Sequence, residues 1–123
     1  MAFTVAQVAN PAAARTVYPE GPFKVIWLDL TFDSSYDNTN GETISASTLG
    51  VNAVVEALVM RHPRDATNKL AVLAIPTISA DYQTVTFRCE EYNGASAGVA
   101  RFQDVANAAD LSLYTMRVAF YCY

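Results

Sequence analysis

The segment FKVIWLDLTFD, residues 23–33, carries the strongest indication of a β-strand in this chain. It is rich in aromatic and β-branched residues, which favour strands, and turn-forming residues flank it on both sides. A period of two separates its apolar side chains into two faces. One face holds Ile26, Leu28, Leu30 and Phe32, and the other holds Phe23, Val25 and Trp27. We expect the second sheet to cover one face, and either an N-terminal arm or a neighbouring subunit to cover the other.

Further segments of the chain also have strand patterns. Residues 84–90 alternate most cleanly, and residues 113–123 alternate apolar with polar or aromatic side chains. We expect the last of these strands to lie inside a sheet, because an exposed apolar edge would promote aggregation. The other expected strands are residues 51–60, residues 69–75, which Pro76 is expected to end, and residues 99–102. The intervening residues 62–65 and 92–98 are expected to form a loop or turn, and residues 104–110 a loop or a helical turn.

The strand at residues 51–60 is the most ambiguous, because its Ala, Glu and Leu content also suits a helix. Before it, Ser45 is placed to cap a single helical turn over residues 46–49, which Gly50 ends in the left-handed conformation. Three valines and the glycine stop favour a strand after this turn.

Short strands separated by turns, without a long helix, predict an all-β fold. We expect an antiparallel β-sandwich, jelly-roll-like, over residues 23–123. Residues 1–22 contain Pro11, Pro19 and Pro22 and no helical stripe, so they are expected to form an extended N-terminal arm. Its apolar residues indicate that the arm docks on another surface.

The composition bears on the partners of the chain. Of its 123 residues, 52% are hydrophobic and only 16% are charged, so part of the apolar surface is expected to face a partner. The net charge is −4, and the eight basic residues are scattered along the sequence, which argues against direct binding of nucleic acid. No apolar run reaches the length of a membrane span, and the first residues lack the pattern of a signal peptide. We therefore expect a soluble protein made in the cytoplasm.

The residues with catalytic potential do not form a known pattern. His62, the sole histidine, lies in a polar segment, where a surface side chain is the simplest interpretation. Cys89 and Cys122 match no metal-binding spacing. They are either buried thiols or a disulfide, and folding in a reducing cytoplasm favours thiols.

An acidic turn is the other candidate site for chemistry. Asp33, Asp37 and Glu42 lie near Asn38 and Asn40, and oxygen-rich loops can hold calcium. Their spacing does not match the calcium-loop pattern, so an ordinary polar turn is favoured. Phosphate-binding and nucleophile motifs are absent from the sequence as well. We therefore expect no enzymatic activity, no metal and no cofactor.

Two stretches of the chain resemble one protein family. TFDSSYDNTNGETISASTLGV, residues 31–51, and ADLSLYTMRVAFYCY, residues 109–123, are similar to parts of the small head decoration proteins, also called cement or minor capsid proteins, of tailed bacteriophages. In the first, a strand ending in FDSSY leads through a turn to a short segment ending in LG. In the second, DLS precedes a valine-containing closing strand. The resemblance implies a β-sandwich that decorates a capsid as a symmetric oligomer, with no catalytic residues.

This resemblance, together with the surplus of aromatic residues, leads to an expected function. We expect a structural virion protein on the capsid surface that bridges subunits of the major capsid protein, as a homo-oligomer for which a trimer is favoured. The alternatives are a tail or neck component and a β-sandwich module that binds carbohydrate or a host surface. The candidate capsid or oligomer interface consists of Phe3, Val5, Val8, Val17, Tyr18, Phe23, Trp27, Tyr121 and Tyr123.

Overall fold

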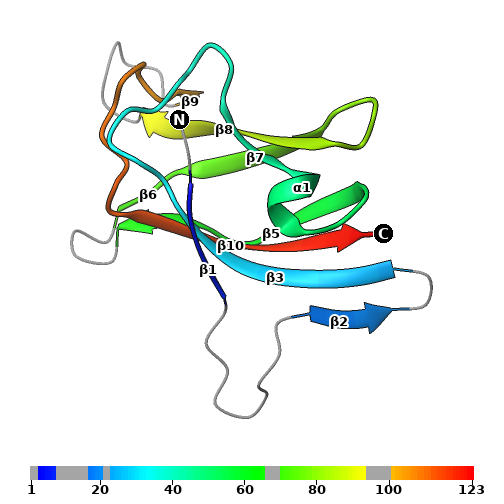
Figure 1. Ribbon diagram of the computed structural model, residues 1–123. Coiled ribbons are helices and arrows are strands. Elements are labelled where there is room, and N and C mark those ends of the chain that lie inside the picture. The colour runs from blue at the N-terminus through cyan, green and yellow to red at the C-terminus, as the bar shows by residue number, and fades with distance from the viewer. Residues whose placement is uncertain (1–2, 8–16, 21–22, 66–69, 94–100) are drawn as a thin grey trace.

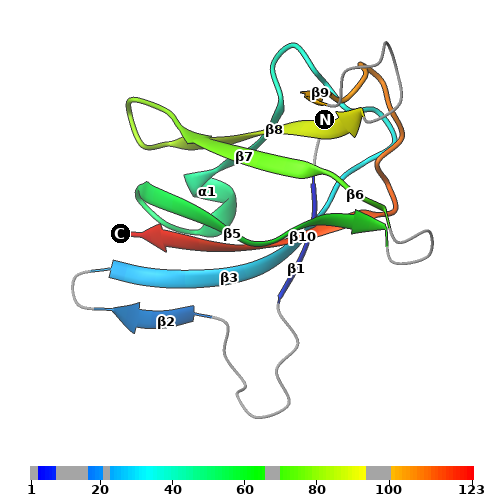
Figure 2. The same cartoon turned by 180° about the vertical axis from the view of Figure 1, so that it is seen from behind.

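The protein is an antiparallel β-sandwich, as predicted (Figure 1). A computed structural model describes residues 3–7, 17–20, 23–65, 70–93 and 101–123. The strands are β1 Thr4–Gln7, β2 Val17–Glu20, β3 Phe23–Thr31, β4 Glu42–Ser45, β5 Val54–Asp65, β6 Leu70–Ala71, β7 Leu73–Ile78, β8 Thr84–Asn93, β9 Arg101–Asp104 and β10 Tyr114–Cys122. The one described helix, α1 Ala46–Leu49, lies between the sheets at one end of the sandwich (Figures 1 and 2). A jelly-roll connection of the strands stays a prediction.

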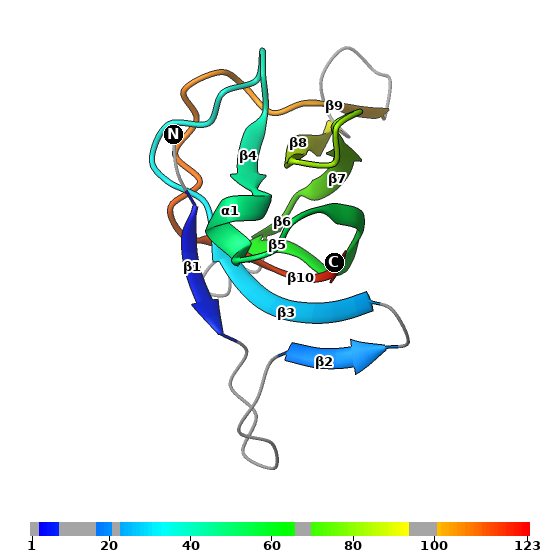
Figure 3. The ribbon, with the colours of Figure 1, turned by 45° about the vertical axis from the view of Figure 1, so that its right-hand side comes forward.

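The larger sheet is built around β3 and β10. Among the described residues its order is β1-β3-β10-β5-β6, and β2 also pairs with β3. β1 pairs with residues 28–31 of β3 and β2 with residues 23–26, so the two short strands follow each other along one edge of β3 (Figure 3). Both described parts of the predicted N-terminal arm are thus paired with this sheet. The domain boundary at residue 22 stays a prediction.

The smaller sheet has a similar arrangement around β8. Its order among the described residues is β4-β8-β7, and β9 pairs with β8 as well. β4 pairs with residues 84–87 of β8, whereas β9 pairs with residues 90–93. Because β7 occupies the opposite edge, β4 and β9 share one edge of β8 and leave a gap between them.

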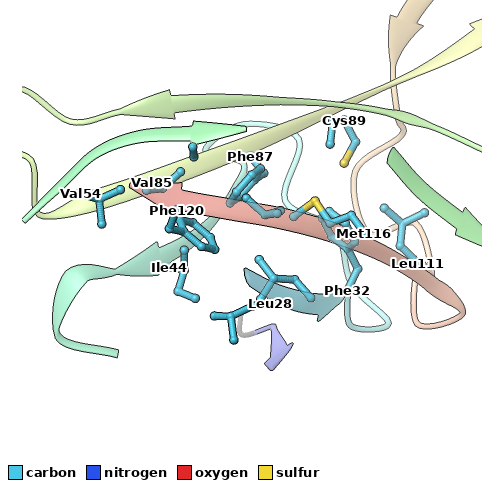
Figure 4. Packing of buried hydrophobic residues seen from close by; sticks show 14 of the residues in the cluster. Leu28, Phe32, Ile44, Val54, Val85, Phe87, Cys89, Leu111, Met116 and Phe120 are labelled. Atoms are coloured by element: carbon cyan, nitrogen blue, oxygen red, sulfur yellow. The ribbon is translucent and has the colours of Figure 1, made fainter. Parts of the chain in front are cut away.

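The core lies between the two sheets and confirms the predicted inner face of β3 (Figure 4). Ile26, Leu28, Leu30 and Phe32 are all buried there. Phe87 of β8 and Phe120 of β10 meet edge to face with ring centroids 6.3 Å apart. Burying one such ring contributes roughly 1.5–3 kcal/mol, so these facing side chains hold the sheets together.

The predicted helical turn and the strand after it are confirmed. The Ser45 hydroxyl accepts a hydrogen bond from the Thr48 N–H at 3.2 Å, and Gly50 ends the turn with a φ of 72°. The ambiguous residues that follow form β5 and no helix.

Several predictions about the strand ends are wrong. β8 continues to Asn93, although the sequence predicts a loop or turn over residues 92–98, because β9 pairs with residues 90–93. Two further errors concern prolines. Residues 62–65 belong to β5 and not to a loop, because Pro63 lies where the pairing with β10 is irregular and an N–H is not needed. The Pro63 carbonyl accepts a hydrogen bond from the Val72 N–H at 3.0 Å. Pro76 lies inside β7 and does not end it, which an edge strand of a sheet tolerates.

Tyr36 closes the gap between β4 and β9. Its hydroxyl accepts a hydrogen bond of 2.7 Å from the Cys89 N–H, which lies between the two paired segments of β8. The Cys89 carbonyl accepts from the Val105 N–H at 3.1 Å. A side chain therefore supplies the acceptor that a continuous neighbouring strand would provide.

We predict that Tyr36→Phe lowers the free energy of unfolding by about 1–3 kcal/mol, because it leaves the buried Cys89 N–H without an acceptor. Urea unfolding measures the change. Tyr82→Phe, which removes the hydroxyl of an exposed tyrosine, is the control and should stay within about 0.5 kcal/mol of the wild type. Equal stability of the two variants would contradict the role of Tyr36.

Gly41 and Gly50 form a second natural pair for comparison. Both have positive φ, 75° and 72°, but a Cβ on Gly41 would lie 2.9 Å from the Phe87 carbonyl oxygen, whereas one on Gly50 would meet nothing within 4 Å. We predict that Gly50→Ala lowers the free energy of unfolding by about 1–2 kcal/mol, because alanine is strained in the left-handed conformation. Gly41→Ala should lower the free energy of unfolding by roughly 1–3 kcal/mol more than Gly50→Ala, because its Cβ would also clash with the Phe87 carbonyl oxygen. Thermal unfolding of both variants checks this order, and equal losses would show that the backbone adjusts at Gly41.

Candidate functional site

The candidate site is the face of the larger sheet that points away from the smaller sheet, here called the outer face (Figure 3). Its residues alternate with the core residues along β3 and β10, and the cross-strand register extends it onto β5. The outer face consists of Phe23, Val25, Trp27, Asp29, Thr31, Glu56, Leu58, Arg61, Arg64, Thr115, Arg117, Ala119 and Tyr121.

One half of the outer face is apolar. Val25 and Ala119 are buried although they do not belong to the core between the sheets. Each lies opposite a half-buried aromatic side chain, since Val25 pairs with Tyr121 and Ala119 pairs with Trp27. Leu58, opposite Ala119 on β5, is 45% exposed. These side chains form a second, smaller apolar layer that reaches the protein surface.

Tyr123 extends this layer beyond the end of β10. Its ring lies against Phe23, with centroids 5.1 Å apart and planes inclined by 48°. Tyr123 is 49% exposed, so the pair forms an aromatic corner at this end of the sheet.

The other half of the outer face is charged. Arg117 donates two hydrogen bonds to Asp29, from Nε to Oδ1 at 2.9 Å and from Nη2 to Oδ2 at 3.1 Å. This contact raises the pKa of Arg117. Arg61 lies directly opposite Arg117, so bases that are scattered in the sequence are neighbours in the sheet. The separation of the basic residues along the sequence is therefore not kept in this part of the sheet.

A small pocket of about 260 Å³ opens beside this charged half. Arg61, Arg64, Leu113 and Thr115 line it. The Thr115 hydroxyl shares a hydrogen bond of 2.8 Å with the Thr31 hydroxyl. No local sequence pattern indicates this pocket, because only the pairing of β5 with β10 brings its residues together.

The predicted interface residues have different places in the structure. Phe23, Trp27, Tyr121 and Tyr123 lie together on the outer face or at its end. Phe3 instead packs against the core, with its ring 4.8 Å from Phe32 and 5.7 Å from Phe87.

The remaining predicted interface residues belong to the N-terminal segments. Val5 lies on β1 and is exposed, and Val8 lies outside the described residues. Val17 and Tyr18 are in β2, where their backbones pair with Ile26 and Val25.

The acidic turn has the structure of an ordinary turn. The Asp37 carboxylate accepts hydrogen bonds from the backbone of Thr39 and Asn40 at 2.9 and 3.0 Å. Arg88 donates to the Thr39 carbonyl at 2.9 Å. Among the described residues, no group of three or more His, Cys, Asp and Glu side chains is arranged to hold a metal ion.

Glu42 is a buried carboxyl group in this turn. Its side chain accepts a hydrogen bond from the Asp37 N–H at 2.8 Å. Burial raises the pKa of Glu42 above its ordinary value of 4.5, and the Asp37 N–H opposes this shift. Glu42 is therefore protonated more readily in the folded state than in the unfolded state. Its ionised form lowers the free energy of unfolding.

We predict that Glu42→Gln increases the free energy of unfolding at neutral pH, because it removes a buried negative charge but keeps an oxygen that accepts from Asp37. The gain should shrink as the pH falls below 4.5, because glutamate then becomes protonated in the unfolded state as well as in the folded state. Denaturant unfolding over this pH range measures it, with the exposed Glu56→Gln as the control. A loss of stability at neutral pH would contradict the prediction.

The cysteines and the histidine have structural positions. Cys89 and Cys122 are free, buried thiols, as favoured by the sequence, and burial raises their pKa values to about 12 and about 11. Such thiols are poor nucleophiles. His62 is exposed, and its Nδ1 accepts a hydrogen bond of 3.1 Å from the Ala74 N–H, which links β5 to β7.

Comparison of the chain with known protein families, curated proteins and solved structures found no match. Within the described part of the chain, no helix has the length and apolar character required to span a membrane.

Proposed function

We propose that this chain is a structural virion protein that decorates a bacteriophage capsid and stabilises it by bridging subunits of the major capsid protein. The observation that carries this proposal is the apolar layer of the outer face, which leaves Leu58 and Tyr123 about half exposed. Exposed apolar surface of this kind is typical of a protein that binds another protein. The resemblance of residues 31–51 and 109–123 to head decoration proteins supports the same function.

The two resembling stretches also form one hydrogen-bonded unit. The Phe32 N–H donates to the Tyr114 carbonyl at 3.1 Å, and the Leu111 N–H donates to the Asp33 carbonyl at 3.1 Å. Segments about 80 residues apart in the sequence thus meet where β3 ends and β10 begins. A resemblance that falls on two contacting segments supports a shared structural element better than one isolated motif.

The proposed activity needs no chemical step. Capsid subunits that bury the apolar layer would gain roughly 25 cal/mol for each Å² of apolar surface removed from water. The charged half of the outer face would lie at the rim of such an interface, where polar groups are usual. In this proposal the chain is made in the host cytoplasm, assembles as a homo-oligomer, for which a trimer is favoured, and binds neither nucleic acid directly nor a cofactor.

A second candidate function is carbohydrate or host-surface binding. The observation that favours it is the exposed ring pair of Phe23 and Tyr123, since aromatic rings can stack on sugar rings. A tail or neck component of a virion is a third candidate and differs from decoration in copy number. Quantitative mass spectrometry of purified particles, against the major capsid protein, separates these functions: many copies support decoration, a dozen or fewer support the tail or neck, and none supports a free binding module.

We predict that Leu58→Lys weakens binding to capsids about tenfold, because it introduces a charge into the apolar layer without disturbing the core. Binding is measured by sedimentation with capsids that have been stripped of this chain. Ile75→Lys is the matched control. Ile75 is also an exposed aliphatic residue, with 41% of its surface exposed against 45% for Leu58, but it lies on the smaller sheet. It should bind like the wild type.

Two results would contradict this assignment. Equal binding of Leu58→Lys and the wild type would show that the outer face does not contact the shell. A loss in Ile75→Lys alone would assign the contact to the smaller sheet. Thermal unfolding of both variants establishes that neither result comes from a damaged fold.

A further inference from the structure

The arginine pocket of the outer face is built by irregularities in β5. Arg64 pairs with Thr115 and Arg61 pairs with Arg117, so β5 has one more residue than β10 between these two pairs. A second extra residue follows before the pair of Val59 with Val118. Bulges of this kind redirect side chains, and here they bring two arginines three positions apart to one face. The pocket lies near the start of β10, where Leu113 and Thr115 line it, and close to β6, which pairs with Arg64.

The charges around this pocket are not balanced. Asp29 neutralises Arg117, but Arg61 and Arg64 have no ion-pair partner among the described residues. This is notable in a chain with 12 acidic and eight basic residues. Arg61 and Arg64 lie on the same face of β5, and Arg61 also lies opposite Arg117. Like charges placed this close repel, so an anion between Arg61 and Arg64 would be attracted.

The size and the lining of the pocket restrict the anion. A guanidinium group matches the two oxygens of a carboxylate or a phosphate. The volume of about 260 Å³ is below the range of typical small-molecule sites, and the net charge of −4 opposes the approach of a polyanion. Leu113, which is 64% exposed, gives the pocket an apolar wall that suits the methylene groups of an acidic side chain.

We propose that the pocket between Arg61 and Arg64 receives an aspartate or glutamate side chain of the partner protein. This inference rests on the proposed function in one respect, namely that the partner is the capsid subunit bound by the outer face. The apolar layer and the pocket lie on the same sheet, so one protein surface can contact both. A charged pair at the rim would fix the orientation of the two proteins.

The pocket can be tested without capsids. The probe is a short blocked peptide with a single glutamate, and the same peptide with glutamine is its control. Binding is followed by the NMR signals of the arginine Nε–H groups. The glutamate peptide should shift these signals for Arg61 and Arg64, and also the backbone amide signals of Leu113 and Thr115, which line the same pocket. The amide shifts of Leu113 and Thr115 should disappear in the double variant R61Q/R64Q, which keeps these two residues. The variant Lys24→Gln, which removes an exposed charge elsewhere on β3, should keep them.

Inorganic phosphate and a conservative variant identify the chemistry of the ligand. Phosphate that binds while the glutamate and glutamine peptides remain indistinguishable would overturn the carboxylate assignment. Arg64→Lys keeps the charge but loses the two-pronged donor, so it should bind the glutamate peptide more weakly than the wild type. Its fold is checked by thermal unfolding, and unchanged binding would contradict a specific guanidinium site.

Capsid binding then separates this inference from the proposed function. R61Q/R64Q should bind stripped capsids about tenfold more weakly than the wild type, with a smaller dependence on salt. Equal binding and equal salt dependence would overturn the pocket and leave the decoration function intact. A wild-type chain that binds the glutamate peptide but no capsid would keep the pocket and overturn the decoration function.

Discussion

The position of β10 between β3 and β5 is the constraint on which the other features of the molecule depend. Its inner side chains, Met116, Val118, Phe120 and Cys122, are completely buried in the core. Because side chains alternate along a strand, fixing these residues also fixes the residues between them on the opposite face. A one-residue slip in register would exchange the core with the outer face. The candidate interaction surface is therefore as well defined as the core itself.

The two sheets are joined by polar contacts as well as by apolar packing. The chain leaves β3, crosses to the smaller sheet and inserts the Tyr36 hydroxyl next to Cys89 of β8. Gly41 then passes so close to Phe87 that a side chain would not fit. On the other side of the sandwich, His62 of β5 accepts a hydrogen bond from β7. These contacts join the two sheets at several points in addition to the apolar core.

The sequence predicted the parts of the fold that depend on local patterns. Alternation placed the inner face of β3, and a serine cap with a glycine stop placed α1. The continuation of β5 through Pro63 could not be predicted from the sequence. A proline is tolerated there because the pairing with β10 is irregular at this point, and this irregularity is a property of the folded sheet. For the same reason the neighbourhood of Arg61 and Arg64 was missed. The contact of Phe3 with Phe87 likewise depends on tertiary packing and has no local signal in the sequence.

The two halves of the outer face have complementary physical roles. Apolar burial is not directional, so a layer of Trp27, Leu58 and Tyr121 alone would bind a partner in several orientations. A pair of arginines adds a position at which only an acidic group fits well, and it costs little because both side chains remain exposed in the free protein. The bulges of β5 place this pair a fixed distance from the apolar layer. One irregular strand can thus give a sparsely charged protein a surface on which the apolar layer supplies affinity for a partner and the arginine pair sets the orientation of that partner.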